Sequence, residues 1–112
     1  MGDNPTDVAL GYGSVWVSNA NGQSVSRIDP ATNKVTATIK MKGRVPSDVA
    51  TGLGAVWVSE TNSNDVGRID PKTNKQTDEI KTKAYSPADV AVGFGSVWSP
   101  LAHSNQLARI KP

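Results

Sequence analysis

Three aspartates recur at a fixed spacing in this 112-residue chain: Asp7, Asp48 and Asp89 lie 41 residues apart. Each follows a proline by two residues and begins the phrase Asp-Val-Ala. If the fold gathers them, a ring of carboxylates could bind a cation or an amine. The competing interpretation is that each Asp caps the turn after its proline, because aspartate readily accepts hydrogen bonds from nearby backbone N–H groups. A residue repeated in every unit usually builds the unit, which favours capping over ligand binding.

Two polar residues break the repeat. His103 stands where the earlier units have Asn21 and Asn62, and Glu60 stands where the first unit has Asn19. One histidine and one glutamate from different units could act as general acid and base. Since polar exchanges in exposed loops are mostly neutral variation, this catalytic pair is the alternative and not the preferred interpretation.

Composition removes several other functions. The chain has no cysteine, which excludes disulfides and thiolate metal sites. Its net charge of +2 is too small and too scattered to predict a nucleic-acid partner. No apolar run approaches the roughly 18 residues of a membrane span, and the first residues, MGDNPTD, contain no apolar secretory segment. The phrases GYG and GLG lack the helix that a phosphate-binding glycine loop requires.

The elements that must position these residues come from one repeat. The tryptophans, prolines and arginines share the 41-residue spacing: Trp16, Trp57, Trp98; Pro5, Pro46, Pro87; Arg27, Arg68, Arg109. The first unit, residues 5–45, matches the second, residues 46–86, at 23 of 41 positions without an insertion. A shorter third unit covers residues 87–112. We expect each unit to be one structural module.

Each full unit is predicted to form four short antiparallel strands. The phrase SVWVS is β-branched and aromatic, and KVTATIK alternates with the period of two that a strand requires. Between strands, DPATNK is a turn in which Asp29 closes an Asx-turn, Pro30 presets the backbone and Asn33 accepts a left-handed conformation. Four strands in about 40 residues are typical of a β-propeller blade. A stacked β-solenoid is the competing all-β fold, but its coils are usually shorter.

Both faces of each unit are apolar. Val15 and Val17 point to one face of their strand and Trp16 to the other. This pattern fits a blade that is sandwiched between two neighbours. We therefore expect the three repeated tryptophans to form a structural core between blades, and the three arginines to pair with a neighbouring strand or blade.

The repeat P-x-D-V-A-x-G-x-G-x-V-W-V-S…V-x-R-I-D-P-x-T-N-K resembles the blades of YVTN-type and virginiamycin B lyase-like propellers. The stretch VWVSETNSNDVGRIDPKTN, residues 56–74, is the part most similar to the lyase-like blade. The resemblance implies a closed ring of about seven blades, often in an exported or periplasmic protein, with ligand sites on one face. It also implies, for the lyases of this group, histidine and glutamate residues that work with a magnesium ion.

The third unit ends at RIKP, where Lys111 stands in place of Asp29 and Asp70. We therefore expect two four-stranded blades and one three-stranded blade, with an apolar face exposed at each end of the arc. Head-to-tail association would cover those faces. Two chains would close about six blades and three would close about nine; propellers of about four to eight blades favour the homodimer, with the trimer second.

The function predicted on these grounds is a non-enzymatic, self-assembling propeller module that acts as a scaffold or binding surface, with a possible small ligand near Asp7, Asp48 and Asp89. The alternative is a lyase-like propeller enzyme with a magnesium-assisted site that contains His103 and Glu60.

Overall fold

The computed structural model describes residues 4–42, 45–61, 65–81, 89–101 and 106–111. These residues form eleven strands in three antiparallel sheets, with no helix among them. Within this described part, no helix has the length and apolar character needed to cross a membrane. The all-β fold class predicted from the repeat is confirmed.

Each sheet is a simple meander in which strands that follow one another in the sequence are paired. The first sheet contains β1 (Pro5–Gly11), β2 (Ser14–Asn19), β3 (Ser24–Asp29) and β4 (Lys34–Lys40). The second contains β5 (Val45–Gly52), β6 (Ala55–Thr61), β7 (Asp65–Asp70) and β8 (Lys75–Lys81). The third contains β9 (Ala91–Gly93), β10 (Ser96–Leu101) and β11 (Gln106–Ile110).

Two-residue turns join the first two strands of every sheet. In the first sheet both turn residues are left-handed, with φ of 54° at Tyr12 and 72° at Gly13. The same pair of left-handed residues recurs at Leu53–Gly54 and at Phe94–Gly95. Turns with positive φ at both central residues match the right-handed twist of the flanking strands, so the three hairpins close in the same geometry.

The turn between β3 and β4 has the conformation predicted from DPATNK. The Asp29 Oδ1 atom accepts a hydrogen bond from the backbone N of Ala31 at 2.9 Å, and Asn33 has a φ of 59°. The second sheet repeats the arrangement, with a 2.9 Å bond from the Lys72 N to Asp70 Oδ1 and a φ of 57° at Asn74. Short polar side chains therefore fix both turns locally.

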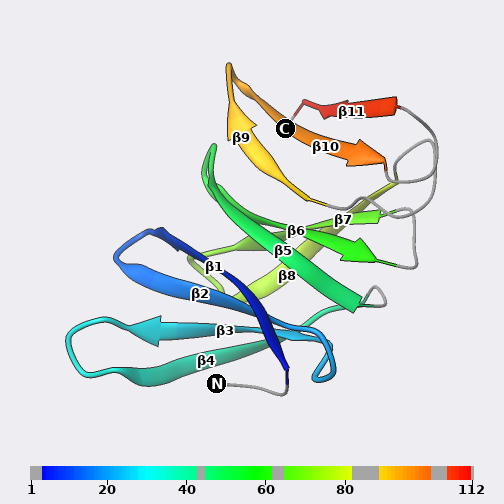
Figure 1. The fold of residues 1–112 in the computed structure, drawn as a ribbon. Helices are drawn as coiled ribbons and strands as arrows, with labels where there is room; N and C mark the ends of the chain where they lie inside the picture. Colours follow the sequence, from blue (N-terminus) through cyan, green and yellow to red (C-terminus); the bar gives the residue numbers. More distant parts are fainter. Residues whose placement is uncertain (1–3, 43–44, 62–64, 82–88, 102–105, 112) are drawn as a thin grey trace.

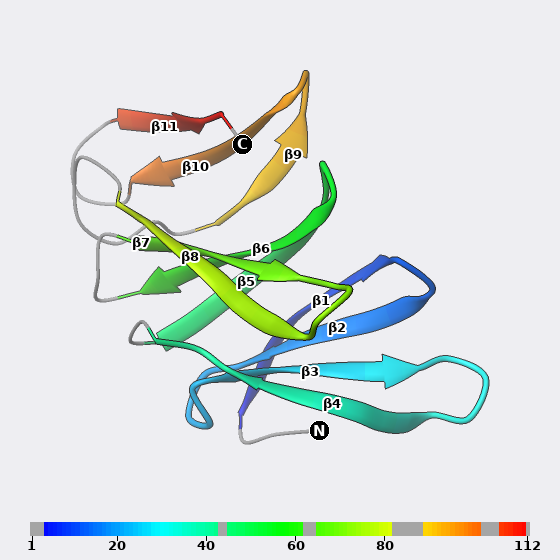
Figure 2. The ribbon, with the colours of Figure 1, turned by 180° about the vertical axis from the view of Figure 1, so that it is seen from behind.

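The three sheets stack face to face and fan out from their first strands (Figures 1 and 2). Strand β1 packs against β5, and β5 packs against β9, whereas the outer strands β4 and β8 contact each other less. Convergence of the first strands and divergence of the last ones gives the stack the shape of an arc.

Two apolar clusters hold the arc together, one between each pair of sheets. The first cluster contains Trp16, Val25 and Ile39 of the first sheet, Met41 just after it, and Val49, Val56, Val58 and Ile69 of the second sheet. The second cluster contains Ala55, Trp57 and Val66 of the second sheet, Val97 and Ile110 of the third, and Val90 just before the third sheet. Trp16 and Trp57 thus each point toward the following sheet.

Burial of the repeated tryptophans follows their place in this stack. Trp16 and Trp57 are both 0% exposed because the next sheet covers them. Trp98, which has no following sheet in the described part of the chain, is only half-buried. The expectation of a fully packed tryptophan in every unit therefore fits the first two units better than the third.

Candidate functional site

The three repeated aspartates lie near the start of the first strand of each sheet. Asp7 is in β1, Asp48 is in β5, and Asp89 lies two residues before β9. The β1–β2 register shifts between Pro5 and Asp7, and the β5–β6 register shifts in the same way between Pro46 and Asp48. A bulge of this kind re-aims the side chain that follows it. Because β1, β5 and β9 are neighbours, equivalent side chains on or just before these strands line up along the edge of the arc.

The carboxyl group of Asp48 interacts with those of Asp89 and Asp7. Burial, hydrogen bonding and repulsion by the Asp89 carboxylate, and then the charge of Asp7, raise the pKa of Asp48 from 3.8 to about 7. Near neutral pH the Asp48 carboxyl group is therefore partly protonated, and a bound cation would favour its ionised form. The structure thus brings together the three aspartates that the spacing singled out.

Backbone groups also engage this row. Asp7 Oδ2 accepts a hydrogen bond from the backbone N of Val49 at 3.0 Å, and Asp89 Oδ1 accepts one from the N of Val90 at 2.7 Å. The Asp89 bond is of the local kind that the capping interpretation requires, whereas the Asp7 bond links the first sheet to the second.

A second acidic group lies inside the second sheet. Glu60 on β6, Asp65 on β7 and Glu79 on β8 each offer a carboxylate oxygen within 4.8 Å of the other two. Glu60 is 0% exposed and Asp65 is 7% exposed. Burial and the neighbouring Glu79 and Asp65 carboxyl groups raise the pKa of Glu60 from 4.5 to about 9. At neutral pH this buried glutamate holds its proton.

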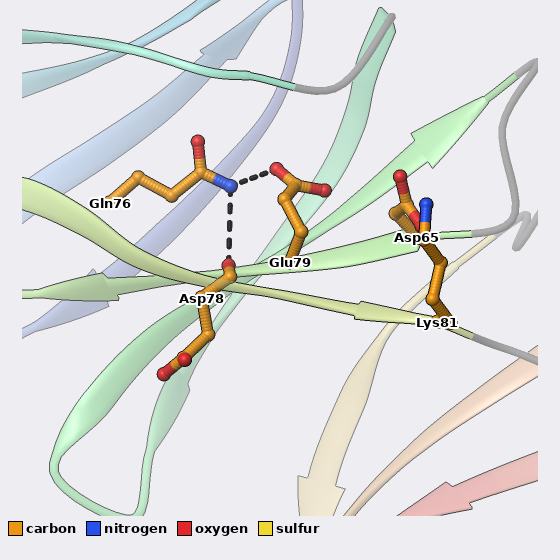
Figure 3. Close-up of polar contacts among 5 residues, drawn as sticks. All are labelled: Asp65, Gln76, Asp78, Glu79 and Lys81. Carbon is orange, nitrogen blue, oxygen red and sulfur yellow. Dashed lines mark hydrogen bonds and ion pairs between the residues drawn. The ribbon is translucent and has the colours of Figure 1, made fainter.

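Figure 3 shows the surroundings of this group along β7 and β8. Lys81 Nζ lies 2.9 Å from Asp65 Oδ1 and forms an ion pair with it. The Gln76 side-chain amide donates hydrogen bonds to Glu79 Oε1 and to the backbone O of Asp78, the latter at 3.2 Å. One cation and one amide therefore offset part of the repulsion among the three carboxyl groups.

Pairing across the strands explains why these residues meet. Glu60 is opposite Asp65 in the β6–β7 register, and Gly67 is opposite Glu79 in the β7–β8 register. A Cβ atom on Gly67 would lie only 2.9 Å from Glu60 Oε1, so the glycine leaves the space that the carboxyl group occupies. In the first sheet the same place holds Asn19, whose amide bonds to Ser24 and Ser26.

The structure describes one member of the predicted catalytic pair, Glu60. We expected Glu60 in an exposed loop, but it belongs to β6 and is buried, because the strand extends further than the polar sequence indicated. His103 lies outside the described residues. Asp65 and Glu79 were not singled out from the sequence. Both depart from the first unit, which has Ser24 and Thr38 at these positions, and that departure was the available signal.

Either acidic group has the ligand type that a hard cation prefers. Carboxylate oxygens suit Mg²⁺ and Ca²⁺, and three of them within a few ångströms match part of such a coordination shell. Glu60 and Asp65 are buried and Glu79 is half-buried, whereas Asp7 and Asp48 are half-buried and Asp89 is exposed. The row of Asp7, Asp48 and Asp89 is therefore more accessible to a ligand than the group of Glu60, Asp65 and Glu79.

No protein-family model and no curated protein matches this sequence. Solved structures do match. Hydrazine synthase of Kuenenia stuttgartiensis superposes with a TM-score of 0.83 at 22% identity, over 94% of this chain and 32% of that one. Virginiamycin B lyase from Staphylococcus aureus superposes with a TM-score of 0.78 at 20% identity, over 96% of this chain and 41% of that one. The WD40 β-propeller domain of Doa1 gives a TM-score of 0.72 at 16% identity, over 90% of this chain and 33% of that one. The chain is an arc of a β-propeller.

Each sheet of this propeller arc is one blade. The likeness to virginiamycin B lyase that the repeat predicted is confirmed at the level of the fold. At such low identities the match shows the fold alone. The chain spans about a third to two fifths of the length of these proteins.

Proposed function

We propose that this chain is a non-catalytic propeller module that joins head-to-tail with a second copy to complete a ring, and that offers the inner edge of that ring as a binding surface. The observation that carries the proposal is a contrast in burial. Positions that are covered between blades inside the chain are exposed at both ends of the arc.

The first exposed surface is the side of the first blade that faces away from the second. Val8 is 58% exposed there, whereas the equivalent residues Val49 and Val90 are 5% and 6% exposed. Leu10 is 70% exposed. Val15 and Ile28 are half-buried, although their counterparts in the second blade are 0% exposed. We call this surface the N-side face; its residues are Val8, Leu10, Val15, Ile28 and Val35.

The second exposed surface is the side of the third blade that faces away from the second. Leu107 is 61% exposed, whereas the equivalent residues Val25 and Val66 are 0% exposed. Phe94 at the adjacent turn is 96% exposed, and Trp98 is half-buried. We call this surface the C-side face; its residues are Phe94, Trp98, Leu107 and Arg109.

The two faces are complementary because they repeat an interface that the chain already contains. The C-side face corresponds residue by residue to the side of the first blade that packs on the second. The N-side face corresponds to the side of the second blade that receives it. Apolar surfaces of this kind drive association, and two different faces make the contact head-to-tail, which is stable when the rotation closes a ring.

Ring closure would place the acidic row at the centre of the molecule. The row of Asp7, Asp48 and Asp89 lies along the converging first strands, so two copies would bring six such carboxyl groups toward one channel mouth. A small cation or amine is the ligand class that such a mouth would recognise. A dimer of two arcs is the preferred assembly, and a trimer is the second.

Light scattering coupled to size-exclusion chromatography tests the assembly. The expected mass at micromolar concentration is twice the 11.8 kDa of one chain. A mass near three chains would keep ring closure and change the number of copies. A folded species that stays at the mass of one chain would overturn the proposal.

A metal-assisted, lyase-like enzyme is the second candidate, and one observation favours it: the Glu60, Asp65 and Glu79 carboxylates lie within 4.8 Å of one another. Such a group offers oxygen ligands to a magnesium ion. A rise in melting temperature with Mg²⁺ that is lost in both Glu60→Gln and His103→Ala would favour the enzyme. A response that is absent, or that persists in both variants, would favour the non-catalytic module.

A further inference from the structure

We infer that Arg109 of one copy binds the β3–β4 turn of the next copy, through the carbonyl oxygen of Pro30 and the side-chain oxygen of Asn33. We call these hydrogen bonds from Arg109 to Pro30 and Asn33 the clasp. They would fix the rotation of one copy relative to the next, which apolar contacts alone specify poorly. The inference rests on the head-to-tail assembly proposed above and names the pair of residues that orients it.

The pattern for this clasp is present inside the chain. Arg27 of the first blade extends across to the β7–β8 turn of the second blade. Its Nη1 atom donates hydrogen bonds to the backbone O of Pro71 at 2.6 Å and to Asn74 Oδ1 at 2.7 Å. A guanidinium group with two oxygen acceptors in fixed positions gives geometric specificity as well as attraction.

Contacts within its own blade hold Arg27 in the extended posture. Its Nε donates to Ser14 Oγ at 2.8 Å, and its guanidinium carbon lies 4.7 Å from the centre of the Trp16 ring. The indole Nε1 in turn donates to the backbone O of Gly11 at 3.0 Å, which fixes the ring. The arginine is therefore aimed at the next blade before any contact with that blade forms.

Arg109 makes the same contacts within its own blade as Arg27 does, but in the described part of the chain it has no acceptors in a following blade. Its Nε donates to Ser96 Oγ at 2.9 Å, and its guanidinium carbon lies 5.0 Å from the centre of the Trp98 ring. The Trp98 Nε1 donates to the backbone O of Gly93 at 3.0 Å, as the equivalent indole does in the first blade. Arg109 is exposed on the C-side face, and in the described part of the chain no acceptor meets its terminal nitrogens.

The β3–β4 turn of the first blade carries matching acceptors. Pro30 and Asn33 occupy the positions of Pro71 and Asn74, and the two asparagines have nearly the same backbone angle, with φ of 59° and 57°. Pro30 and Asn33 are exposed, whereas Pro71 and Asn74 are half-buried beside Arg27. A preformed acceptor pair beside the N-side face thus lacks the arginine that its counterpart binds.

Arg68 supplies a matched control. It has the same repeat position in the middle blade, but its Nη1 donates to Thr77 Oγ1 at 3.0 Å within its own sheet. The proposed interface between copies does not include it. Replacing Arg68 therefore removes an arginine from the same repeat position but leaves the proposed contact between copies intact.

The test uses the full 112-residue chain and measures the dissociation constant by sedimentation at several dilutions. We expect Arg109→Ala and Asn33→Ala each to weaken association, Arg109→Ala by about tenfold or more, since hydrogen bonds to charged groups contribute strongly. The double variant should be little weaker than Arg109→Ala alone, because both changes remove one contact. Arg68→Ala should associate like the wild type, and circular dichroism should show the same strand content in every variant.

Mixing the two single variants gives a sharper result. In a closed head-to-tail pair of Arg109→Ala with Asn33→Ala, one interface carries both changes and the other carries neither. The mixture should therefore associate more tightly than either variant alone. If the wild type associates but Arg109→Ala does so equally well, the clasp is wrong and the assembly stands. If the wild type does not associate at all, the assembly itself fails.

Discussion

Asp7 on β1 accepts a hydrogen bond from the backbone N–H of Val49 on β5, with 3.0 Å between Oδ2 and N. The bond joins the innermost strands of two blades through a residue that the repeat places in every unit. It gives the aspartate a structural role between blades, in addition to any role for its charge at the edge of the arc.

Asp7→Ala should lower the free energy of unfolding by about 1–3 kcal/mol, because the buried backbone N–H of Val49 loses its carboxylate acceptor. Asp7→Asn keeps an acceptor oxygen and should cost much less, as in caps where Asn replaces Asp. Chemical denaturation of both variants measures the difference. Equal stability of Asp7→Ala and the wild type would show that the bond contributes nothing.

The wild type should lose stability as the pH rises from about 4 to 7, because the pKa of Asp48 is raised in the folded state. A carboxyl group with a raised folded pKa stabilises the fold fully below its unfolded pKa, and this contribution is lost as the pH rises through the folded pKa. Asp48→Asn should remove this part of the slope and melt roughly 2–4 °C higher at pH 7, a modest gain because the site is partly exposed. Thermal melts at several pH values test this, and an unchanged slope would contradict it.

Calorimetric titration with Ca²⁺ and Mg²⁺ separates the two interpretations of the acidic row. Heat of binding in the wild type that disappears in Asp48→Asn, with a melting temperature no lower than that of the wild type, would support a cation site at Asp7, Asp48 and Asp89. No heat in either protein would support capping alone. Lys111→Ala, which lies away from the row in the sequence, serves as a charge control.

Trp57→Ala should destabilise the chain by about 3–5 kcal/mol, because the ring is fully buried between the second and third blades. Trp98→Ala is the matched variant: the ring is half-buried, so unfolding of the single chain should be affected less, while association through the C-side face should weaken. Denaturation curves and light scattering record the two effects. An unchanged melting temperature for Trp57→Ala would mean that the blade register is wrong.

Glu60→Gln should be more stable than the wild type at neutral pH and above. The pKa of Glu60 is about 9 in the folded chain against an ordinary 4.5, so the wild type loses stability progressively as the pH rises from about 4.5 to 9. The amide has no proton to lose, and the gain at pH 7 should be at least about 1 kcal/mol. Equal pH profiles for the two proteins would show that the folded chain does not keep the Glu60 carboxyl group protonated.

Local chemistry was enough to predict the blades. Alternating and β-branched segments set the strands, and Asp29 with Asn33 set a turn whose hydrogen bond and left-handed residue are found as expected. The 41-residue spacing predicted three similar units, and the position of Trp16 opposite Val15 and Val17 predicted two apolar faces. These features depend on residues close together in the sequence and on the repeat itself, so the sequence alone is enough to predict them.

The environment of each charged side chain depended on the tertiary structure. Glu60 was expected in a loop and lies buried beside Asp65 and Glu79, because β6 extends through it and cross-strand pairing selects its neighbours. The raised pKa of Asp48 arises from carboxyl groups that lie 41 residues away on either side in the sequence. Burial and charge proximity are properties of stacked blades, so they follow only when the sheets are placed against one another.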